Sequence, residues 1–132
     1  MQSADLHETI SEALATDAQL YTMLGGGRDR VHDRVPSNRK FPFITVDRLQ
    51  ANAWNTDLDD GRDTIATIRV WSRARNRVQS YDIADRIIEI VESLSASATI
   101  ILAQYVSATH ERAVSQNAFL ATLRFRLLTE HA

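Results

Sequence analysis

The segment "TIRVWSRARNRVQSYDIADRIIEIVESL", at residues 67–94, decides the fold class. Its first part alternates in character, with Ile68 and Val70 on one side and Trp71 on the other, which is the period of a β-strand. After a basic turn, apolar residues recur at steps of three and four, which is the period of an amphipathic helix. They are Tyr81, Ala84, Ile87, Ile88, Val91 and Leu94. This order predicts a two-layer unit in which Ile68 and Val70 pack against the stripe formed by Tyr81, Ile87 and Val91.

The residues before this unit predict a hairpin partner for its strand. Residues 41–55, "FPFITVDRLQANAWN", are extended in pattern, but the apolar side switches between Val46 and Leu49. A parity switch near residues 47–48 indicates a β-bulge. The connection "TDLDDGRD" at residues 56–63 is polar and contains an Asp-Gly turn signal. We therefore expect a long hairpin with an acidic tip.

The N-terminal segment has a helical pattern over residues 4–24, in which Leu6, Ile10 and Leu24 keep the period of three and four. Asp17 is placed to divide it and to cap the second piece. The glycines at 25–27 are expected to end the helix, because glycine takes the left-handed backbone conformation that closes a helix. The basic loop that follows holds one short strand near Val31.

Two further strands are predicted over residues 98–112 and 117–130. The last one alternates cleanly, with Arg124 and Arg126 outward, and its inward residues are Phe119, Ala121, Leu123, Phe125 and Leu127. The helix between the two strand pairs is expected to begin near Asn76, with Gln79 as its capping-box partner. The predicted fold is one α+β domain over residues 1–132, with a mainly antiparallel sheet of four to five strands and two main helices on one face.

Composition excludes several classes of protein. The chain has 132 residues, no cysteine and a net charge of −2, so disulfides and thiolate metal sites are excluded and no global attraction to nucleic acid is expected. The acidic N-terminus is unlike a signal peptide. No apolar run approaches the roughly 20 residues that a membrane span requires. We expect a soluble chain that is not exported and does not bind a membrane.

No catalytic or metal-binding motif stands out. Counted from Asp57, the acidic stretch puts glycine at position five and Ile68 at position twelve, so it fails the spacing of a calcium-binding EF-hand loop. The glycines at 25–27 follow a predicted helix, whereas a phosphate loop follows a strand. The histidines are dispersed, and no nucleophile-elbow motif exists. We therefore predict a protein that is not an enzyme, with no catalytic residue, no metal and no cofactor.

Charged and aromatic residues mark a candidate interface. Arginine and tryptophan are enriched at the energetic centres of protein interfaces. The candidate residues are Asp57, Asp59, Asp60, Asp63, Arg69, Trp71, Arg73, Arg124 and Arg126. Two alternatives stay open: the acidic residues are a solvated hairpin tip, and Trp71 lies under loops or a helix with arginines around it. The basic loop at 31–42 is a further candidate contact segment.

Three motifs resemble a known family. They are "LGGGRDRVHDRVP" at 24–36, "FPFITV" at 41–46, and "VWSR" at 70–73 together with "ADRI" at 84–87. In this order, and over roughly residues 6–128, the chain resembles the tail terminator or tail-completion (head–tail joining) proteins of long-tailed bacteriophages and of gene transfer agents.

The resemblance implies an α+β fold without cofactor or reaction. It implies a ring, usually a hexamer, on the end of the tail tube, where it stops tube growth and joins the tail to the head connector. The implied partners are other copies of the chain, the tail tube protein and the head-completion protein, with passage of DNA through the ring but no specific nucleic-acid binding. The implied location is the tail–neck junction of the virion, after assembly in the host cytoplasm. Alternatives are another neck, head-closure or tail-assembly protein, and a small ligand-binding domain or enzyme.

Overall fold

The computed structural model describes residues 2–26, 30–37, 40–56, 59–73, 77–96 and 99–130, without the side chains of 53–56, 59–60 and 96. Its centre is a five-stranded sheet in the order β1-β2-β3-β5-β4. The strands are β1 (Val31–His32), β2 (Phe43–Thr56), β3 (Asp59–Ser72), β4 (Ile100–Ala113) and β5 (Ala118–Thr129). Neighbouring strands are antiparallel except β1 and β2, which are parallel.

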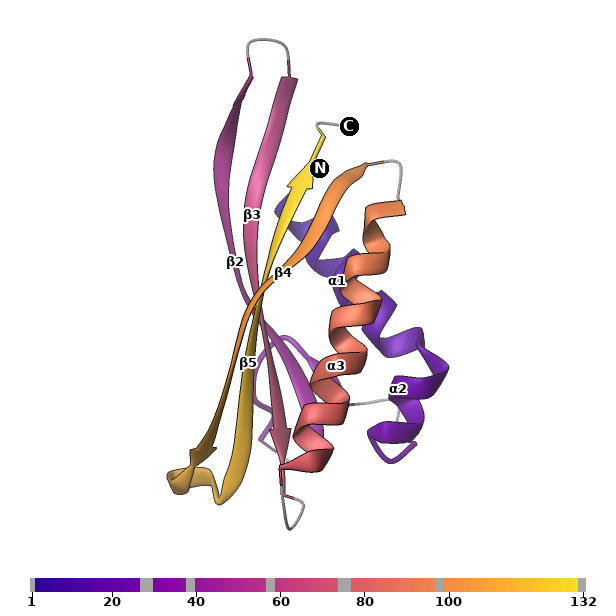
Figure 1. Ribbon diagram of the computed structural model, residues 1–132, viewed down its shortest axis with the longest axis vertical. Helices are drawn as coiled ribbons and strands as arrows, with labels where there is room; N and C mark the ends of the chain where they lie inside the picture. Colours follow the sequence, from indigo (N-terminus) through magenta and orange to yellow (C-terminus); the bar gives the residue numbers. More distant parts are fainter. Residues whose placement is uncertain are drawn as a thin grey trace.

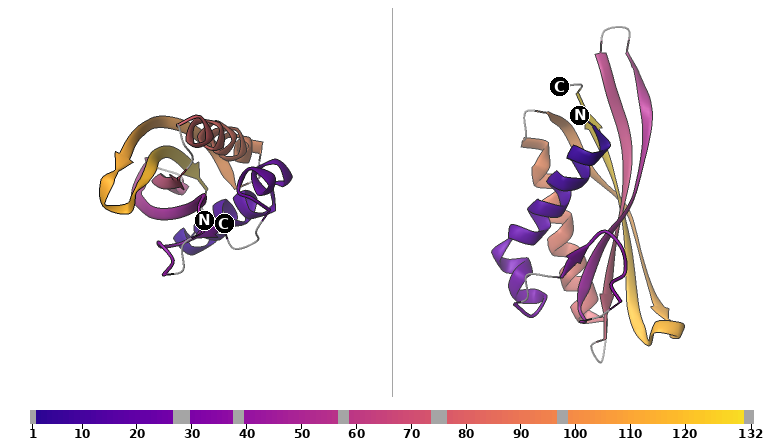
Figure 2. Two further views of the ribbon diagram at one scale, coloured as in Figure 1. Left: turned by 90° about the horizontal axis from the view of Figure 1, so that it is seen from below. Right: turned by 180° about the vertical axis from the view of Figure 1, so that it is seen from behind.

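Three α-helices lie on one face of this sheet, as Figures 1 and 2 show. They are α1 (Ser3–Thr16), α2 (Ala18–Met23) and α3 (Val78–Ser93), and short 3-10 helices follow at Leu94–Ala96 and Val114–Gln116. The other face of the sheet carries none of the described helices, and we call it the open face. The predicted α+β class, with a mainly antiparallel sheet and one helical layer, is confirmed.

The core lies between the sheet and the helices. Ile68 on β3 and Leu123 on β5 are cross-strand partners that belong to one core cluster with Ile87 on α3, and all three are fully buried. The predicted alternation of β5 is confirmed for Ala121, Leu123, Phe125 and Leu127, which have no exposed surface, whereas Phe119, also predicted inward, is only half-buried. Burial of this apolar surface is the main stabilising contribution to the fold.

The predicted capping box of α3 is wrong, whereas its predicted start near Asn76 lies within two residues of the observed one. The helix begins at Val78, with Arg77 in the N-cap position and no side-chain cap hydrogen bond, while Asn76 lies outside the described residues. Gln79 is not a capping-box partner, because its Oε1 accepts a hydrogen bond from the Ser72 hydroxyl at 2.5 Å. This bond links the end of β3 to the first turn of α3.

The predicted apolar stripe of α3 is wrong at one position. Tyr81 is 41% exposed, and its ring meets that of His110 edge-on at 4.5 Å. The buried residues of α3 are Ser80, Ile83, Ala84, Ile87, Ile90 and Val91. Successive residues of a helix are about 100° apart, so the residue after Ser80 lies at the margin of the buried arc. The small Ser80 therefore takes the place in the core that the pattern assigned to Tyr81.

Helix ends in the N-terminal segment follow the predicted chemistry. The Asp17 carboxylate caps α2, because its Oδ2 accepts a hydrogen bond from the Leu20 N–H at 2.9 Å. Gly25 has φ +86° and Gly26 has φ +76°, which is the left-handed region that closes a helix. Their N–H groups donate to the carbonyls of Thr22 and Tyr21. The predicted cap and the predicted glycine stop are both confirmed.

The hairpin of β2 and β3 is longer than predicted and outreaches its neighbour. Its register shifts between Val46 and Arg48, which confirms the predicted bulge. Pairing between β3 and β5 begins only at Arg62 with Thr129, whereas β2 and β3 stay paired out to Thr56 and Asp59. We call residues 53–56 and 59–61 the hairpin arm. It projects as a two-stranded ribbon beyond the helices and beyond the ends of the chain (Figure 1).

Candidate interaction surface

Four arginines lie on the open face of the sheet, on its three central strands. Arg48 on β2 and Arg124 on β5 both pair with Thr67 on β3, so they lie in one row across the sheet. Arg69 and Arg126 lie beside this row on β3 and β5. Because alternate residues of a strand share a face, all four guanidinium groups are on the side away from the helices. The prediction that Arg124 and Arg126 point outward is confirmed.

Arg69 is held by an acidic residue that the sequence pattern did not select. Its Nη1 lies 2.5 Å from the Asp47 Oδ2, and the carboxylate is the more buried partner. Asp47 is the residue at which the β2 register shifts, so the bulge brings its carboxylate beside Arg69. The parity switch in the sequence located the bulge, but the ion pair depends on the register between two strands.

Arg126 is also paired within the chain. Its Nη2 lies 2.8 Å from the Asp63 Oδ2, and its Nε lies 3.1 Å from the Asp63 Oδ1. This contact raises the pKa of Arg126, because a hydrogen-bonded carboxylate favours the charged guanidinium. Two predicted interface residues, from neighbouring strands that are far apart in the sequence, therefore form an ion pair with each other at the base of the hairpin arm.

Trp71 belongs to an aromatic cluster at the other end of the open face. Its ring stacks on that of Phe43 with centroids 5.8 Å apart, and Phe43 meets Phe41 edge-on at 5.1 Å. The Arg73 guanidinium lies 3.9 Å from the centre of the Phe41 ring and donates to the Gln116 carbonyl at 2.8 Å. Trp71 is half-buried and its Nε1 donates to the Thr45 hydroxyl at 3.4 Å, while Arg73 packs on Phe41, so the interface role of Trp71 stays a prediction.

Of the predicted interface arginines, Arg124 is the one that no described residue engages by hydrogen bond or ion pair. It is exposed and lines a hollow of about 190 Å³ in the open face. The hollow is lined by Arg48, Gln50, Ile65, Thr67, Arg69 and Arg124. Arg48 donates to Gln50 at 3.1 Å, which leaves most of its donors unused. We call this cavity the arginine hollow.

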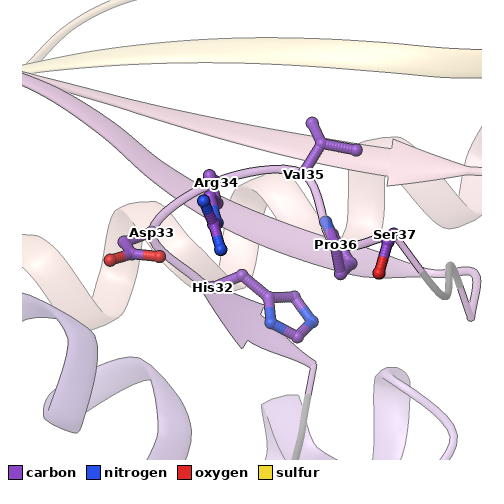
Figure 3. A pocket seen from close by; sticks show the side chains of 6 residues that line it. All are labelled: His32, Asp33, Arg34, Val35, Pro36 and Ser37. Carbon is purple, nitrogen blue, oxygen red and sulfur yellow. The ribbon is translucent and has the colours of Figure 1, made fainter.

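A second depression lies over the loop after β1. It measures about 600 Å³ and is lined by His32, Asp33, Arg34, Val35, Pro36 and Ser37 (Figure 3). Its walls come from six consecutive residues of one segment, and the side chains in Figure 3 point in different directions. The depression is therefore the concave side of a loop and does not gather chemical groups from several elements.

The remaining predicted residues are on the hairpin arm. Asp57 lies outside the described residues. Asp59 and Asp60 begin β3, and their side chains lie outside the described part of the chain. Sequence reasoning missed Arg48 and Gln50 as wall residues of the hollow. The signal was present, because both follow the bulge and alternate outward with Asn52.

Reactive chemistry is not concentrated at this surface. Among the described residues, no group of three His, Cys, Asp or Glu side chains is placed to hold a metal ion. Burial lowers the pKa of His110, which faces Tyr81 rather than a nucleophile. In the part of the chain that the structure describes, no helix is long and apolar enough to cross a membrane. The surface offers charge, hydrogen-bond donors and shape, which are the properties of a binding surface.

The fold and this surface define a small α+β interaction module, with one covered face, one arginine-bearing open face and a projecting arm. The chain belongs to the tail completion protein gp17 family, whose family model matches residues 8–130. This match confirms the resemblance read from the sequence motifs. Membership places the chain among the structural proteins of phage tail assembly.

A solved structure has a similar fold. It is described as the virion of a native gene transfer agent particle, and one of its chains matches with a TM-score of 0.81 and 17% identity. The match covers 96% of this chain and 95% of that chain. At this identity the similarity shows a shared fold. A comparison with curated protein sequences found no match.

Proposed function

We propose that this protein is a tail terminator, a structural protein that acts without catalysis or cofactor. In this proposal, residues 1–132 form one terminator domain. Copies of it assemble as a ring, a hexamer by the family resemblance, on the end of the tail tube. The ring stops further addition of tube protein and joins the tail to the head connector, at the tail–neck junction of the virion.

The observation that carries this proposal is the pair of unlike surfaces on one chain. The hairpin arm projects beyond the body (Figure 1), and the open face carries arginines, of which Arg124 has no hydrogen-bond or ion-pair partner among the described residues. A ring requires a heterologous contact, in which one surface of a subunit meets a different surface of its neighbour. A membrane role or a metal-dependent role has no comparable support among the described residues.

The edge of the sheet is poorly suited to strand addition, which favours contacts through the face and the arm. On the outer strand β4, the Ser95 hydroxyl accepts from the Ala103 N–H at 2.9 Å and donates to the Ala103 carbonyl at 3.2 Å. The Glu92 carboxylate accepts from the Tyr105 N–H at 3.3 Å. Side chains therefore occupy backbone groups of Ala103 and Tyr105 that an added strand would use. Two register shifts in β4 hinder pairing further.

We infer that the acidic residues of the hairpin and the arginines of the open face contribute to ring or tube contacts. In the test, the parent, an Asp59→Ala/Asp60→Ala variant and an Arg69→Ala variant are mixed with tail tubes and viewed by negative-stain electron microscopy. Asp5→Ala, a change to an exposed acid on α1, is the control. The proposal predicts six-fold rings on tube ends with parent and control, and fewer rings with the other two variants.

Equal capping by all four proteins would contradict the assignment of these residues. Native mass spectrometry of the same samples gives the subunit number. Binding to isolated connectors, without binding to tube ends, would replace the terminator by a head-closure protein. A protein that binds neither partner and stays monomeric would contradict an assembly role altogether.

A further inference from the structure

We propose that the arginine hollow is the subunit joint of the ring and that it receives the acidic outer side of α3 from a second copy of the chain. This inference rests on the proposed ring and adds the two surfaces that meet within it. The hollow holds the guanidinium groups of Arg48, Arg69 and Arg124, with one internal carboxylate, Asp47, against them. It therefore carries a net positive charge and fits a carboxylate ligand.

The outer side of α3 supplies such carboxylates in a row. Asp82, Asp85, Glu89 and Glu92 follow one another at steps of three, four and three residues, and all four are exposed. At about 100° per residue they occupy one arc of the helix, opposite the buried arc that contains Ile87 and Val91. We call these four residues the acidic stripe. A helix face that only contacts water can carry charges of both signs. This arc carries four acidic residues and no basic one, which points to a basic partner.

The free charge of the stripe is concentrated in its first turn. Arg86 donates to Glu89 at 2.8 Å, and Glu92 accepts from the Tyr105 N–H. Asp82 and Asp85 form no hydrogen bond or ion pair with any described residue. On the open face, Arg124 likewise forms no hydrogen bond or ion pair with any described residue. The chain thus has exposed carboxylates without a described partner on one surface and an exposed guanidinium without a described partner on the other.

The two surfaces face in opposite directions on one molecule. The acidic stripe lies opposite the buried arc of α3, with Glu92 beside the outer strand β4, and the residues of the arginine hollow lie on the open face, which the described helices do not cover. Because the two surfaces lie on opposite sides of the chain, one two-fold symmetric contact cannot bury both of them against their complements. A head-to-tail contact brings the opposite charges together, and its repetition gives a ring where the rotation between subunits closes.

The spacing of the charges is compatible. Arg48 and Arg124 lie two strand spacings apart in one row, which is about 9.5 Å. Carboxylates two helical turns apart, such as Asp85 and Glu92, are separated by about 10.5 Å along the helix axis. A helix laid across the strands therefore presents one carboxylate to each arginine of the row. The hollow of about 190 Å³ between them accommodates a carboxylate side chain.

Cysteine cross-linking tests the joint directly, because the chain contains no cysteine. Arg124→Cys and Asp85→Cys copies are mixed, assembled on tail tubes and treated with a short bismaleimide, whose spacer covers the separation of an arginine and an aspartate backbone that a disulfide is too short to bridge. The inference predicts a dimer band on a non-reducing gel for the mixture and none for either variant alone. The matched control pairs Arg124→Cys with Glu12→Cys, an exposed acid on α1, and is expected to give no dimer.

Charge exchange provides a second, independent readout. Arg124→Asp and Asp85→Arg are each expected to lower the fraction of protein in rings at least about tenfold, because like charges then meet at the joint. A chain that carries both changes restores the attraction and is expected to form rings close to the parent level. Circular dichroism of each variant shows whether the chain remains folded.

The outcomes separate this inference from the proposed function. Rings that cap tubes without a 124–85 cross-link would overturn the joint and leave the terminator assignment intact. A cross-link from position 124 to the tube protein would show that the tube protein occupies the hollow. Rings that dissolve on nuclease treatment would show that a nucleic acid occupies it. Either result overturns the inference. Failure of the unmodified chain to cap tubes would overturn the proposed function as well.

Discussion

Arg126 and Asp63 form a two-point ion pair at the position where the hairpin arm leaves the sheet. The Nη2–Oδ2 distance is 2.8 Å and the Nε–Oδ1 distance is 3.1 Å. On the same strand, Arg62 donates to the Ser3 hydroxyl at 3.2 Å and so reaches the start of α1. Asp63 and Arg62 are the first residues of β3 that pair with β5. They are therefore bonded to β5 on one face of the sheet and to the helical layer on the other.

From this relationship we predict that Arg126→Met loosens the hairpin arm without unfolding the domain. An isolated two-stranded ribbon is marginally stable in water, so its order depends on such ties at its base. Hydrogen exchange is expected to speed up in residues 53–61 and to stay unchanged in α3. Equal protection of the arm in both proteins would contradict this role. Arg124→Met, which removes an arginine without a described partner, is the matched control.

The corrected stripe of α3 leads to a contrast between two substitutions. Ile87→Ala removes a fully buried side chain from the core and is expected to lower the free energy of unfolding by about 2–5 kcal/mol. Tyr81→Ala removes an exposed ring whose contact with His110 contributes about 1 kcal/mol. Urea denaturation compares the two variants. A larger loss of unfolding free energy for Tyr81→Ala than for Ile87→Ala would support the apolar stripe predicted from the sequence, in which Tyr81 is a core residue.

Asp17 is expected to make the stability of the folded protein depend on pH in the acidic range. The hydrogen bonds from Arg86, at 2.6 and 3.0 Å, and the bond from the Leu20 N–H lower the pKa of this carboxyl below 3.8. The charged form is thus favoured in the folded state. Its stabilisation is fully present above pH 3.8 and is lost as the pH falls through the lower folded-state pKa.

Two variants separate the contributions of Asp17. Asp17→Asn keeps the N-cap acceptor and is expected to abolish the added sensitivity below pH 3.8. Asp17→Ala also removes the cap, at a further cost of about 0.5–2 kcal/mol at neutral pH. Thermal unfolding measured from pH 2.5 to 7 distinguishes them. Identical pH profiles for the parent and Asp17→Asn would show that the ion pair with Arg86 has no effect.

His110 is expected to act in a different pH range. Burial lowers its pKa below 6.5, the nearby Asp85 charge opposes this shift, and Arg77 adds to it. The unfolded chain then binds a proton at a higher pH than the folded chain does. Stability is full above pH 6.5 and falls as the pH drops from 6.5 through the folded-state pKa.

His110→Phe keeps a ring against Tyr81 and removes the titrating group. We expect the urea midpoint of the parent to fall between pH 7.5 and pH 5.5 and that of His110→Phe to fall less. An equal fall in both proteins would assign the pH dependence to other groups.

Local patterns predicted those parts of the fold that local chemistry determines. The alternation of β5, the bulge beside Asp47, the cap at Asp17 and the glycine stop follow from side-chain period, parity or backbone conformation within a few residues. The capping box at Gln79 was predicted wrongly because its side chain accepts a hydrogen bond from the Ser72 hydroxyl, which the fold brings close.

The surface could be predicted only in part, because its contacts join strands that are distant in sequence. Asp63 and Arg126 are 63 residues apart, and their contact depends on β5 being inserted between β3 and β4. Sequence alone gave these residues as free charges for a partner, whereas the fold uses them internally. The arginine hollow likewise requires three strands in register, so no single segment contains its signal.

The most direct test of the account is a tube-extension experiment viewed by electron microscopy. Tail tubes are incubated with this protein, then with excess tube protein, and the tube lengths are measured. The account predicts ring-shaped caps at one end of the tubes and no growth from that end. Continued growth from both ends, with this protein bound along the tube or not at all, would contradict it.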